Sequence, residues 1–200
     1  KSALAFHVGR LVADQYPDGQ IVVDMRGTSD APLTPVEAMT EVVRVFDPAA
    51  SLPDDIDAAR QIYTSVLAEK RVLIVLDNAQ NTVQVSGMLP PESCGMIVTS
   101  RHTIVLPGAP QFNLDALSDE DSRKLLKEII GETRTSEAEL DEIARLCGHL
   151  PLALRVAGNF MKGHRNFLAR DYISKLADEK RRLEELQQDD LDVKATLGLC

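Results

Sequence analysis

The sequence predicts an α/β fold, with a parallel, doubly wound sheet in the first part of the chain and only helices in the second. Short apolar runs alternate with helical patterns as far as about residue 114, an order typical of sheets built from β-α units. The run from Val72 to Leu76 is apolar throughout, as in a strand buried on both faces. After Leu117 only helical patterns follow.

Each element of the first part has its own signal. An amphipathic helix is expected over residues 1–16, because four apolar side chains share one face: Leu4, Val8, Leu11 and Val12. Thr34 and Glu37 form a capping box around Pro35, so a helix is expected from there to about Phe46. The other expected elements are strands at 20–25, 72–77, 95–100 and 111–114, a helix at 54–67 and a short helical segment after residue 80.

The second part contains three well-marked helix starts. Ser118 precedes three acidic residues, which favour the positive end of a helix. Ser136 and Glu139 form a second capping box, and Gly148 is expected to end that helix. Pro151 then begins a helix that should end near Gly163. Further helices are expected at 171–177, at 179–187 and from residue 190 onward.

Composition sets limits on function. The chain has 200 residues, of which 44% are hydrophobic, enough for a well-formed core. The net charge of −9 argues against direct nucleic-acid binding by this segment, because phosphate contacts need clustered Lys and Arg. Three widely spaced cysteines form neither a disulfide framework nor metal-ligand pairs. With no apolar run long enough to cross a membrane, we expect a cytoplasmic protein.

Asp77 is the first candidate for chemistry, since it ends the most apolar run of the chain. The carboxyl ends of parallel strands open into the crevice where α/β sheets bind ligands. A carboxylate there can hold Mg²⁺ against a phosphate chain. The alternative is that Asp77 only caps the next turn, and the strand alone does not decide between the two.

Two further candidates could share that crevice. Lys1 and Ser2, followed at once by a helix, match the end of the phosphate-binding pattern G-x-x-x-x-G-K-[ST]. Arg101 follows the strand at 95–100, and its charge would suit a terminal phosphate. Alone, the Lys-Ser pair could be chance and Arg101 a surface residue. Three such residues predicted at one edge of a sheet favour a phosphate site.

The segment from Cys147 to Leu154 predicts a tight corner between two helices. Gly148 stops one helix, and Pro151 starts the next. Leu150 and Pro151 could lie against a flat purine ring, which favours apolar contact. The alternative is a corner that merely connects its helices.

These segments together resemble an NB-ARC domain, a member of the signal-transduction ATPases with numerous domains and of the P-loop fold related to AAA+ proteins. The resemblance rests on five segments in order: KSALA, DGQIVVDMRG, RVLIVLDNAQ, GMIVTSR and CGHLPLALRVAG. PDGQIVVDMRG, PLTPVEAM and ADEKRRLEEL resemble the bacterial subgroup found in multidomain transcriptional regulators of the actinobacterial antibiotic-regulator type. The resemblance covers essentially all 200 residues.

The resemblance implies a domain order and a set of roles. Residues 1–117 would be the nucleotide-binding core, 118–176 a helical subdomain, and 177–200 a linker and the first helix of a winged helix. Lys1 and Ser2 would end the Walker A loop and Asp77 would be the Walker B acid, with Ser2 and Asp77 on Mg²⁺. Arg101 would contact the γ-phosphate.

The adenine side of the site would come from the corner. Pro151 matches the proline of a Gly-Leu-Pro-Leu motif that packs on adenine, with Leu150 beside it, while His149 replaces the usual neighbour. The implied function is an ATP/ADP-binding switch with slow ATP hydrolysis in the intact protein. Its partners would be other domains of the same polypeptide, with self-assembly in the ATP state.

Two departures from the pattern leave an alternative open. The glycines of the loop and the strand before it would lie upstream of Lys1, so we expect the natural protein to begin earlier. Asn78 stands where many relatives have a second acid, which leaves no evident carboxylate base for water. A nucleotide-independent scaffold that retains the fold is therefore the alternative function; a metabolic P-loop kinase fits the helical second part less well.

Overall fold

The chain forms two compact units in a computed structural model, Lys1–Phe112 and Asn113–Cys200, and each is treated by itself below. The structure describes residues 1–131, 135–164 and 166–188, with side chains through Glu179. Within these residues no helix is both long and apolar enough to cross a membrane.

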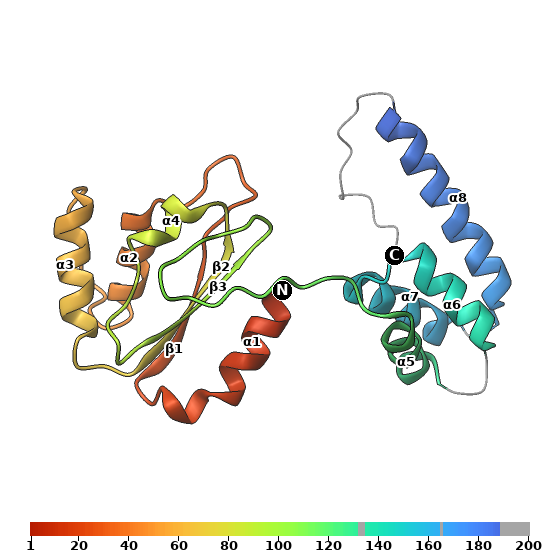
Figure 1. The fold of residues 1–200 in the computed structure, drawn as a ribbon, viewed down its shortest axis with the longest axis horizontal. Helices are drawn as coiled ribbons and strands as arrows, with labels where there is room; N and C mark the ends of the chain where they lie inside the picture. Colours follow the sequence, from red (N-terminus) through yellow and green to blue (C-terminus); the bar gives the residue numbers. More distant parts are fainter. Residues whose placement is uncertain (132–134, 165, 189–200) are drawn as a thin grey trace. The chain divides into compact units, whose positions relative to one another are not determined.

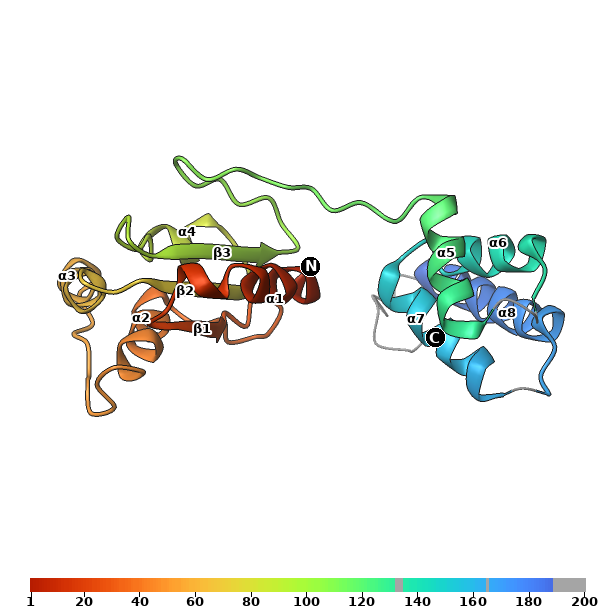
Figure 2. The same ribbon diagram turned by 90° about the horizontal axis from the view of Figure 1, so that it is seen from below.

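The first unit is built on a three-stranded parallel sheet, which confirms the mixed α/β prediction at that level. The strands lie in the order β1-β2-β3, seen in Figure 2, so β2 is central. Their bounds are Gly19–Asp24 for β1, Val72–Ala79 for β2 and Gly95–Ser100 for β3. The predicted strands at 20–25, 72–77 and 95–100 are thus confirmed to within two residues.

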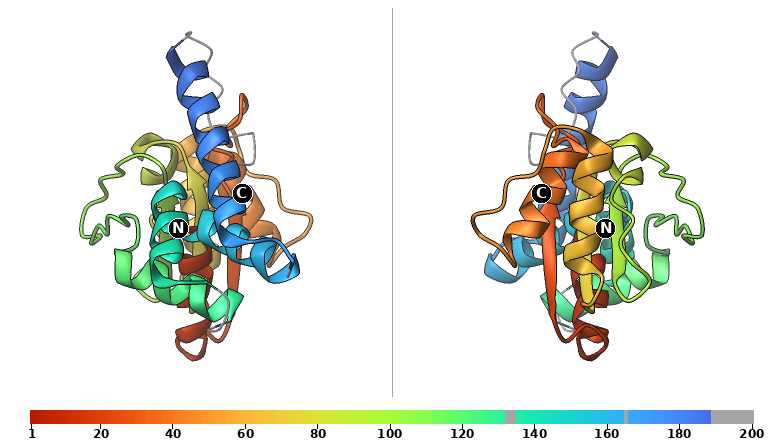
Figure 3. Two further views of the ribbon diagram at one scale, coloured as in Figure 1. Left: turned by 90° about the vertical axis from the view of Figure 1, so that its right-hand side faces the viewer. Right: turned by 90° about the vertical axis from the view of Figure 1, so that its left-hand side faces the viewer.

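Helices cover both faces of this sheet. On one face α1 (Ser2–Leu11) packs on Leu73 and Val75, and a short 3-10 turn, η1 (Ala13–Gln15), follows it. On the other face α2 (Pro35–Arg44) and α3 (Ile56–Leu67) enclose the main core with the alternate side chains of β1 and β2. Figures 1 and 3 show the α2–α3 pair on the side of the sheet away from α1. The short helix α4 (Thr82–Ser86) follows β2.

The expected strand at 111–114 is wrong, because these residues adopt no regular structure. A four-residue strand needs a neighbour that accepts and donates its backbone hydrogen bonds. Within the described residues the second edge of β3 pairs with no other strand. Phe112 is accordingly 81% exposed.

Helix α1 also differs from the expectation, since it ends at Leu11 and not near Tyr16. Its buried residues are Ala5 and Gly9, whereas Leu4 and Leu11 are 46% and 71% exposed. Small residues allow the helix to approach the sheet closely: a Cβ at Gly9 would lie 3.4 Å from the Leu73 side chain. Close approach through small side chains therefore replaces the leucine-rich contact that periodicity alone suggested.

The described residues of the second unit form helices and no strands. They are α5 (Asp119–Ile130), α6 (Glu137–Leu146), α7 (Pro151–Gly163) and α8 (Ala169–Gln188). α5 packs on α6 and α7, and α6 packs on α8 (Figure 1). Ser118 caps α5, and Ser136 with Glu139 forms the predicted capping box of α6.

The two helices expected at 171–177 and 179–187 are wrong as separate elements, because α8 is continuous across them. Asp178 lies between them without a glycine or proline beside it, so nothing in the backbone stops the helix there. The helix expected from residue 190 lies outside the described residues.

Candidate functional site

The carboxyl ends of the three strands meet at one edge of the sheet in the first unit. Asp24 and Asp77 are register partners on β1 and β2, and Ala79 is opposite Ser100 on β3. The Lys1 ammonium donates a hydrogen bond to the Ser100 carbonyl over 2.7 Å. This bond brings the N-terminal end of α1 to the tip of β3.

Asp77 is half-buried, and its carboxylate is held by Thr99 of the neighbouring strand. The Thr99 hydroxyl donates to Asp77 Oδ1 over 2.5 Å and accepts the Asn78 amide over 3.0 Å. Thr99 is 8% exposed, so water competes little for either bond. The β2–β3 pairing is interrupted between Leu76 and Ala79, an irregularity of the kind that often re-aims side chains at functional sites.

The loop after β1 is hydrogen-bonded to β2 at the same edge of the sheet. Gly27 donates its amide to the Asn78 carbonyl over 2.7 Å, and Asn78 Nδ2 donates to Thr28 Oγ1 over 3.2 Å. A Cβ at Gly27 would lie 2.4 Å from the Asn78 oxygen, so no side chain fits there. Arg26 and Asn78 both adopt positive φ, at 52° and 57°. Backbones of this kind in non-glycine residues concentrate at functional sites.

Sequence reasoning missed Thr99 and the Gly27–Asn78 contact. A hydroxyl at a buried strand position directly before the strand tip was the available signal for Thr99. For Gly27 the signal was a glycine directly after a strand, which often marks close backbone approach. Neither signal identifies the partner residue without the strand register.

The other sequence-predicted residues of this unit lie at the same edge. Arg101 follows β3 directly and is exposed, and its side chain forms no hydrogen bond or ion pair within the described part of the chain. Ser2 is the first residue of α1 and half-buried. Lys1, Asp77 and Arg101 therefore lie at the same carboxyl edge of the sheet.

A metal ion at this edge would need oxygen ligands from a bound phosphate compound or water, in addition to those of the protein. Among the residues that the structure describes, no three His, Cys, Asp or Glu side chains gather into a metal-binding group. Asp77 offers a carboxylate and Ser2 a hydroxyl, both hard oxygen donors. This set fits Mg²⁺ bound to one carboxylate, phosphate oxygens and water, and does not fit a cage made by protein alone.

The corner between α6 and α7 carries the remaining candidates, in the second unit. Gly148 and His149 have consecutive positive φ values of 60° and 55°, which turn the chain sharply. Leu150 then occupies the N-cap of α7 and Pro151 its first turn. Leu150 and Leu152 are 55% and 76% exposed. The corner therefore has an exposed apolar surface formed by Leu150, Pro151 and Leu152.

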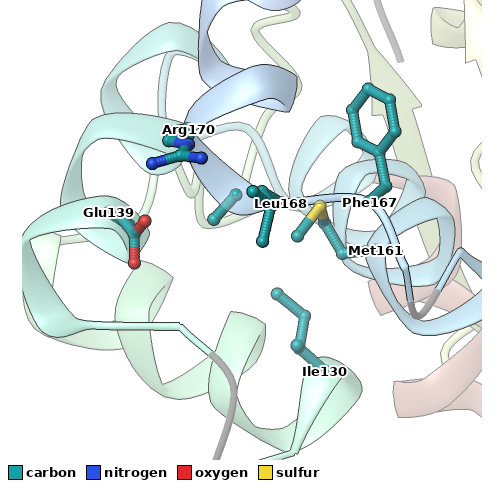
Figure 4. A pocket seen from close by; sticks show the side chains of 7 residues that line it. Ile130, Glu139, Met161, Phe167, Leu168 and Arg170 are labelled. Atoms are coloured by element: carbon teal, nitrogen blue, oxygen red, sulfur yellow. The ribbon is translucent and has the colours of Figure 1, made fainter.

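A cavity of about 300 Å³ lies between helix ends in the second unit (Figure 4). Its lining is mixed: apolar side chains such as Ile130, Met161 and Leu168 share it with Glu139 and Arg170. The Glu139 carboxylate is occupied by the capping box: the Ser136 hydroxyl and amide donate to it over 2.7 and 2.9 Å. These bonds lower the pKa of Glu139. We interpret the cavity as a packing gap, because its acidic group already has partners.

The chain is similar to segments of two larger regulatory proteins. Regulatory protein AfsR of Streptomyces griseus is 40% identical over 205 residues, and AfsR of Streptomyces coelicolor (strain ATCC BAA-471 / A3(2) / M145) is 38% identical over the same length. Both matches cover 100% of this chain. The chain is homologous to part of AfsR-type regulatory proteins. It spans about a fifth of their length, 21% and 20%. No protein-family model matches it.

Proposed function

We propose that this chain is the nucleotide-binding switch of a multidomain bacterial regulator, an NB-ARC domain that binds ATP and ADP. The observation that carries the proposal is the carboxyl edge of the sheet, where Lys1, Asp77 and Arg101 stand together and Thr99 orients the acid. The relatives are named regulatory proteins, which supports the regulatory role.

Each residue has a distinct part in this proposal. Lys1 neutralises the terminal phosphates, and Arg101 contacts the γ-phosphate, which only ATP carries. Ser2 and Asp77 hold Mg²⁺ together with phosphate oxygens and water.

Base recognition is assigned to the corner between α6 and α7. The exposed, apolar Leu150 and Pro151 pack on the adenine ring.

The glycine loop and its strand belong to the proposal as well. We propose that this strand pairs with the second edge of β3. Burial supports this: Val72 to Leu76 of β2 are buried, whereas Met96, Ile97 and Val98 of β3 are half-buried. A further strand would cover β3 and would also give the segment at 111–114 a partner.

The proposed switch depends on the γ-phosphate, the group that distinguishes ATP from ADP. ATP shifts the protein toward an assembly-competent state only to the extent that it binds that state more tightly than ADP does. Contacts of Arg101 with the γ-phosphate supply that difference, and a tenfold preference corresponds to about 1.4 kcal/mol. Hydrolysis of ATP resets the switch. It is slow because Asn78 offers an amide where a carboxylate would accept a proton from water.

Asn78 also supports the alternative function. Its side chain is engaged with Thr28 and its carbonyl with Gly27, so the residue serves the structure of the edge. A scaffold that kept the P-loop fold and lost nucleotide binding would retain these contacts. The two functions differ in whether the intact protein binds nucleotide.

Calorimetry on the full-length protein with Mg²⁺-ATP and Mg²⁺-ADP tests the proposal. The parent should bind both nucleotides, and Asp77→Ala should weaken Mg²⁺-ATP at least about tenfold, because the metal loses its protein carboxylate. Asp14→Ala removes an exposed acid of η1 and should behave as the parent. A parent that binds neither nucleotide would leave the scaffold function.

A further inference from the structure

The buried side chain of Gln84 connects the loop after β1 to the turn after β2. Its Nε2 donates to the carbonyls of Met25 and Leu33, each over 2.7 Å, and its Oε1 accepts the Gln80 amide over 2.8 Å. Gln84 is only 6% exposed, although glutamine is usually a surface residue. We call these three hydrogen bonds the Gln84 bridge.

The three partners of the bridge match the chemistry of a glutamine side chain. Two carbonyls need two donors and one amide needs an acceptor, and a single carboxamide supplies all of these. A carboxylate at position 84 would bring negative charge against two carbonyl oxygens. An apolar side chain would remove a donor from each carbonyl, which is costly where water cannot replace it.

The bridge holds both ends of the loop that follows β1. The Leu33 amide donates to the Met25 carbonyl over 3.1 Å, so residues 26–32 form a loop that is closed at its base. Met25 and Leu33 are buried, at 0% and 6% exposure. Gln84 donates to both of them from α4, so the base of this loop is held by an element that follows β2.

The same loop supports the backbone around Asp77. The Met25 amide donates to the Asp77 carbonyl over 2.8 Å, and the Gly27 amide donates to the Asn78 carbonyl over 2.7 Å. Regular pairing with β3 is interrupted at this point of β2, so the bonds from the β1 side hold the backbone where the ladder does not. Met25 links the bridge to the acid, because its carbonyl accepts from Gln84 and its amide donates to Asp77.

We propose that Gln84 is a positioning residue for the metal of a bound Mg²⁺-nucleotide: through Met25 it holds Asp77 where its carboxylate binds the ion. The inference rests on the proposed function and adds to it a residue that lies outside the carboxyl edge. Gln84 is buried and donates to the loop, so it acts on the metal only through Asp77. Residues that hold a metal ligand in place commonly control metal affinity without touching the ion.

The test uses the full-length protein and an ATP analogue with a β,γ-imido bridge, which resists hydrolysis. Gln84→Met keeps the length of the side chain and removes the three hydrogen bonds. Gln84→Asn is a milder change that keeps the carboxamide on a shorter side chain. Leu67→Ala is the control for stability: it removes buried volume at the end of α3, shortly before β2 begins and so at the opposite end of that strand from Asp77.

Three measurements are made on each variant. Calorimetry gives the affinity for the analogue in Mg²⁺ and in EDTA, urea denaturation gives the stability, and hydrogen exchange reports the amides of Met25 and Gly27. The quantity that decides is the gain in affinity from Mg²⁺, because a general loss of stability lowers both affinities together.

In the expected result, Gln84→Met weakens binding in Mg²⁺ about threefold to tenfold and leaves binding in EDTA within about twofold of the parent, because only the metal loses a well-placed ligand. Gln84→Asn acts in the same direction, and the amides of Met25 and Gly27 exchange faster in both variants. In an Asp77→Ala background, Gln84→Met has no further effect on binding in Mg²⁺, as for residues that act as one unit. Leu67→Ala lowers the urea midpoint and keeps the gain in affinity from Mg²⁺.

Two outcomes would overturn the inference while the proposed function stands. One is a gain in affinity from Mg²⁺ that is the same in Gln84→Met, in Gln84→Asn and in the parent. The other is an equal loss of affinity in Mg²⁺ and in EDTA that Leu67→Ala reproduces, which would mark a purely structural role. A parent that binds the analogue under neither condition would refute the proposed function and the positioning role with it.

Discussion

Replacing Thr99 by Val removes one hydroxyl and keeps the shape and the β-branching that suit a strand. The Asp77 carboxylate then loses a hydrogen bond of 2.5 Å, and the Asn78 amide loses its acceptor at 3.0 Å. A bond to a charged group contributes about 1.5–3 kcal/mol and a neutral one about 1 kcal/mol. Since Asp77 is only half-buried and regains water, we expect a net loss of about 2 kcal/mol.

Urea denaturation followed by circular dichroism measures this loss. With a slope of about 2 kcal/mol per M, the midpoint of the first unit should fall by about 1 M. Thr99→Ser keeps the hydroxyl and should restore most of the loss, and Thr103→Val changes an exposed hydroxyl and should be neutral. The full-length Thr99→Val protein should also bind Mg²⁺-ATP more weakly. A midpoint and an affinity equal to those of the parent would refute the role given to Thr99.

Three further predictions concern the stability of the two units, and urea midpoints measure each. Gly27→Ala should lower the free energy of unfolding by about 1–3 kcal/mol, because its Cβ would lie 2.4 Å from the Asn78 backbone oxygen. Gly163→Ala is the control: its Cβ would meet no atom within 4 Å, so it should not destabilise the protein. Tyr63→Phe should cost about 1 kcal/mol, since the buried hydroxyl donates to a backbone carbonyl over 2.9 Å and burial raises its pKa; a gain in stability would contradict this. The lowered pKa of Glu139 means that its stabilising contribution is present above the ordinary value of 4.5 and is lost as pH falls through the lowered one. Glu139→Gln should therefore flatten the acid dependence of the midpoint, and an unchanged dependence would argue against the capping box.

Features set by local chemistry could be predicted from the sequence. The apolar run from Val72 to Leu76 forms the central strand because only a strand buried on both faces tolerates it. The capping boxes at Thr34 and Ser136 start their helices where the spacing indicated, since both partners of each box lie within one turn.

Features that depend on contacts across the chain could not be predicted. The hold of Thr99 on Asp77 needs the register of β2 and β3, which two isolated runs do not specify. The burial of Ala5 and Gly9 in place of the leucines of α1 depends on how closely that helix approaches the sheet. The expected strand at 111–114 failed because strand formation requires a partner as well as a pattern.

The roles of Lys1, Asp77 and Arg101 are predictions about ligand binding rather than about the fold. The strand order brings these residues to one edge of the sheet, as their positions in the sequence suggested. Nucleotide binding to the full-length protein tests whether they form a phosphate site.

The ratio of ATP to ADP affinity in the full-length protein tests the switch most directly. Calorimetry should give a ratio that changes toward equal affinities in Arg101→Ala, because that arginine is proposed to contact the γ-phosphate. Arg71→Ala changes an exposed arginine that precedes β2, at the opposite end of the strands, and should leave the ratio as in the parent. The same ratio in the parent and in Arg101→Ala would contradict the account.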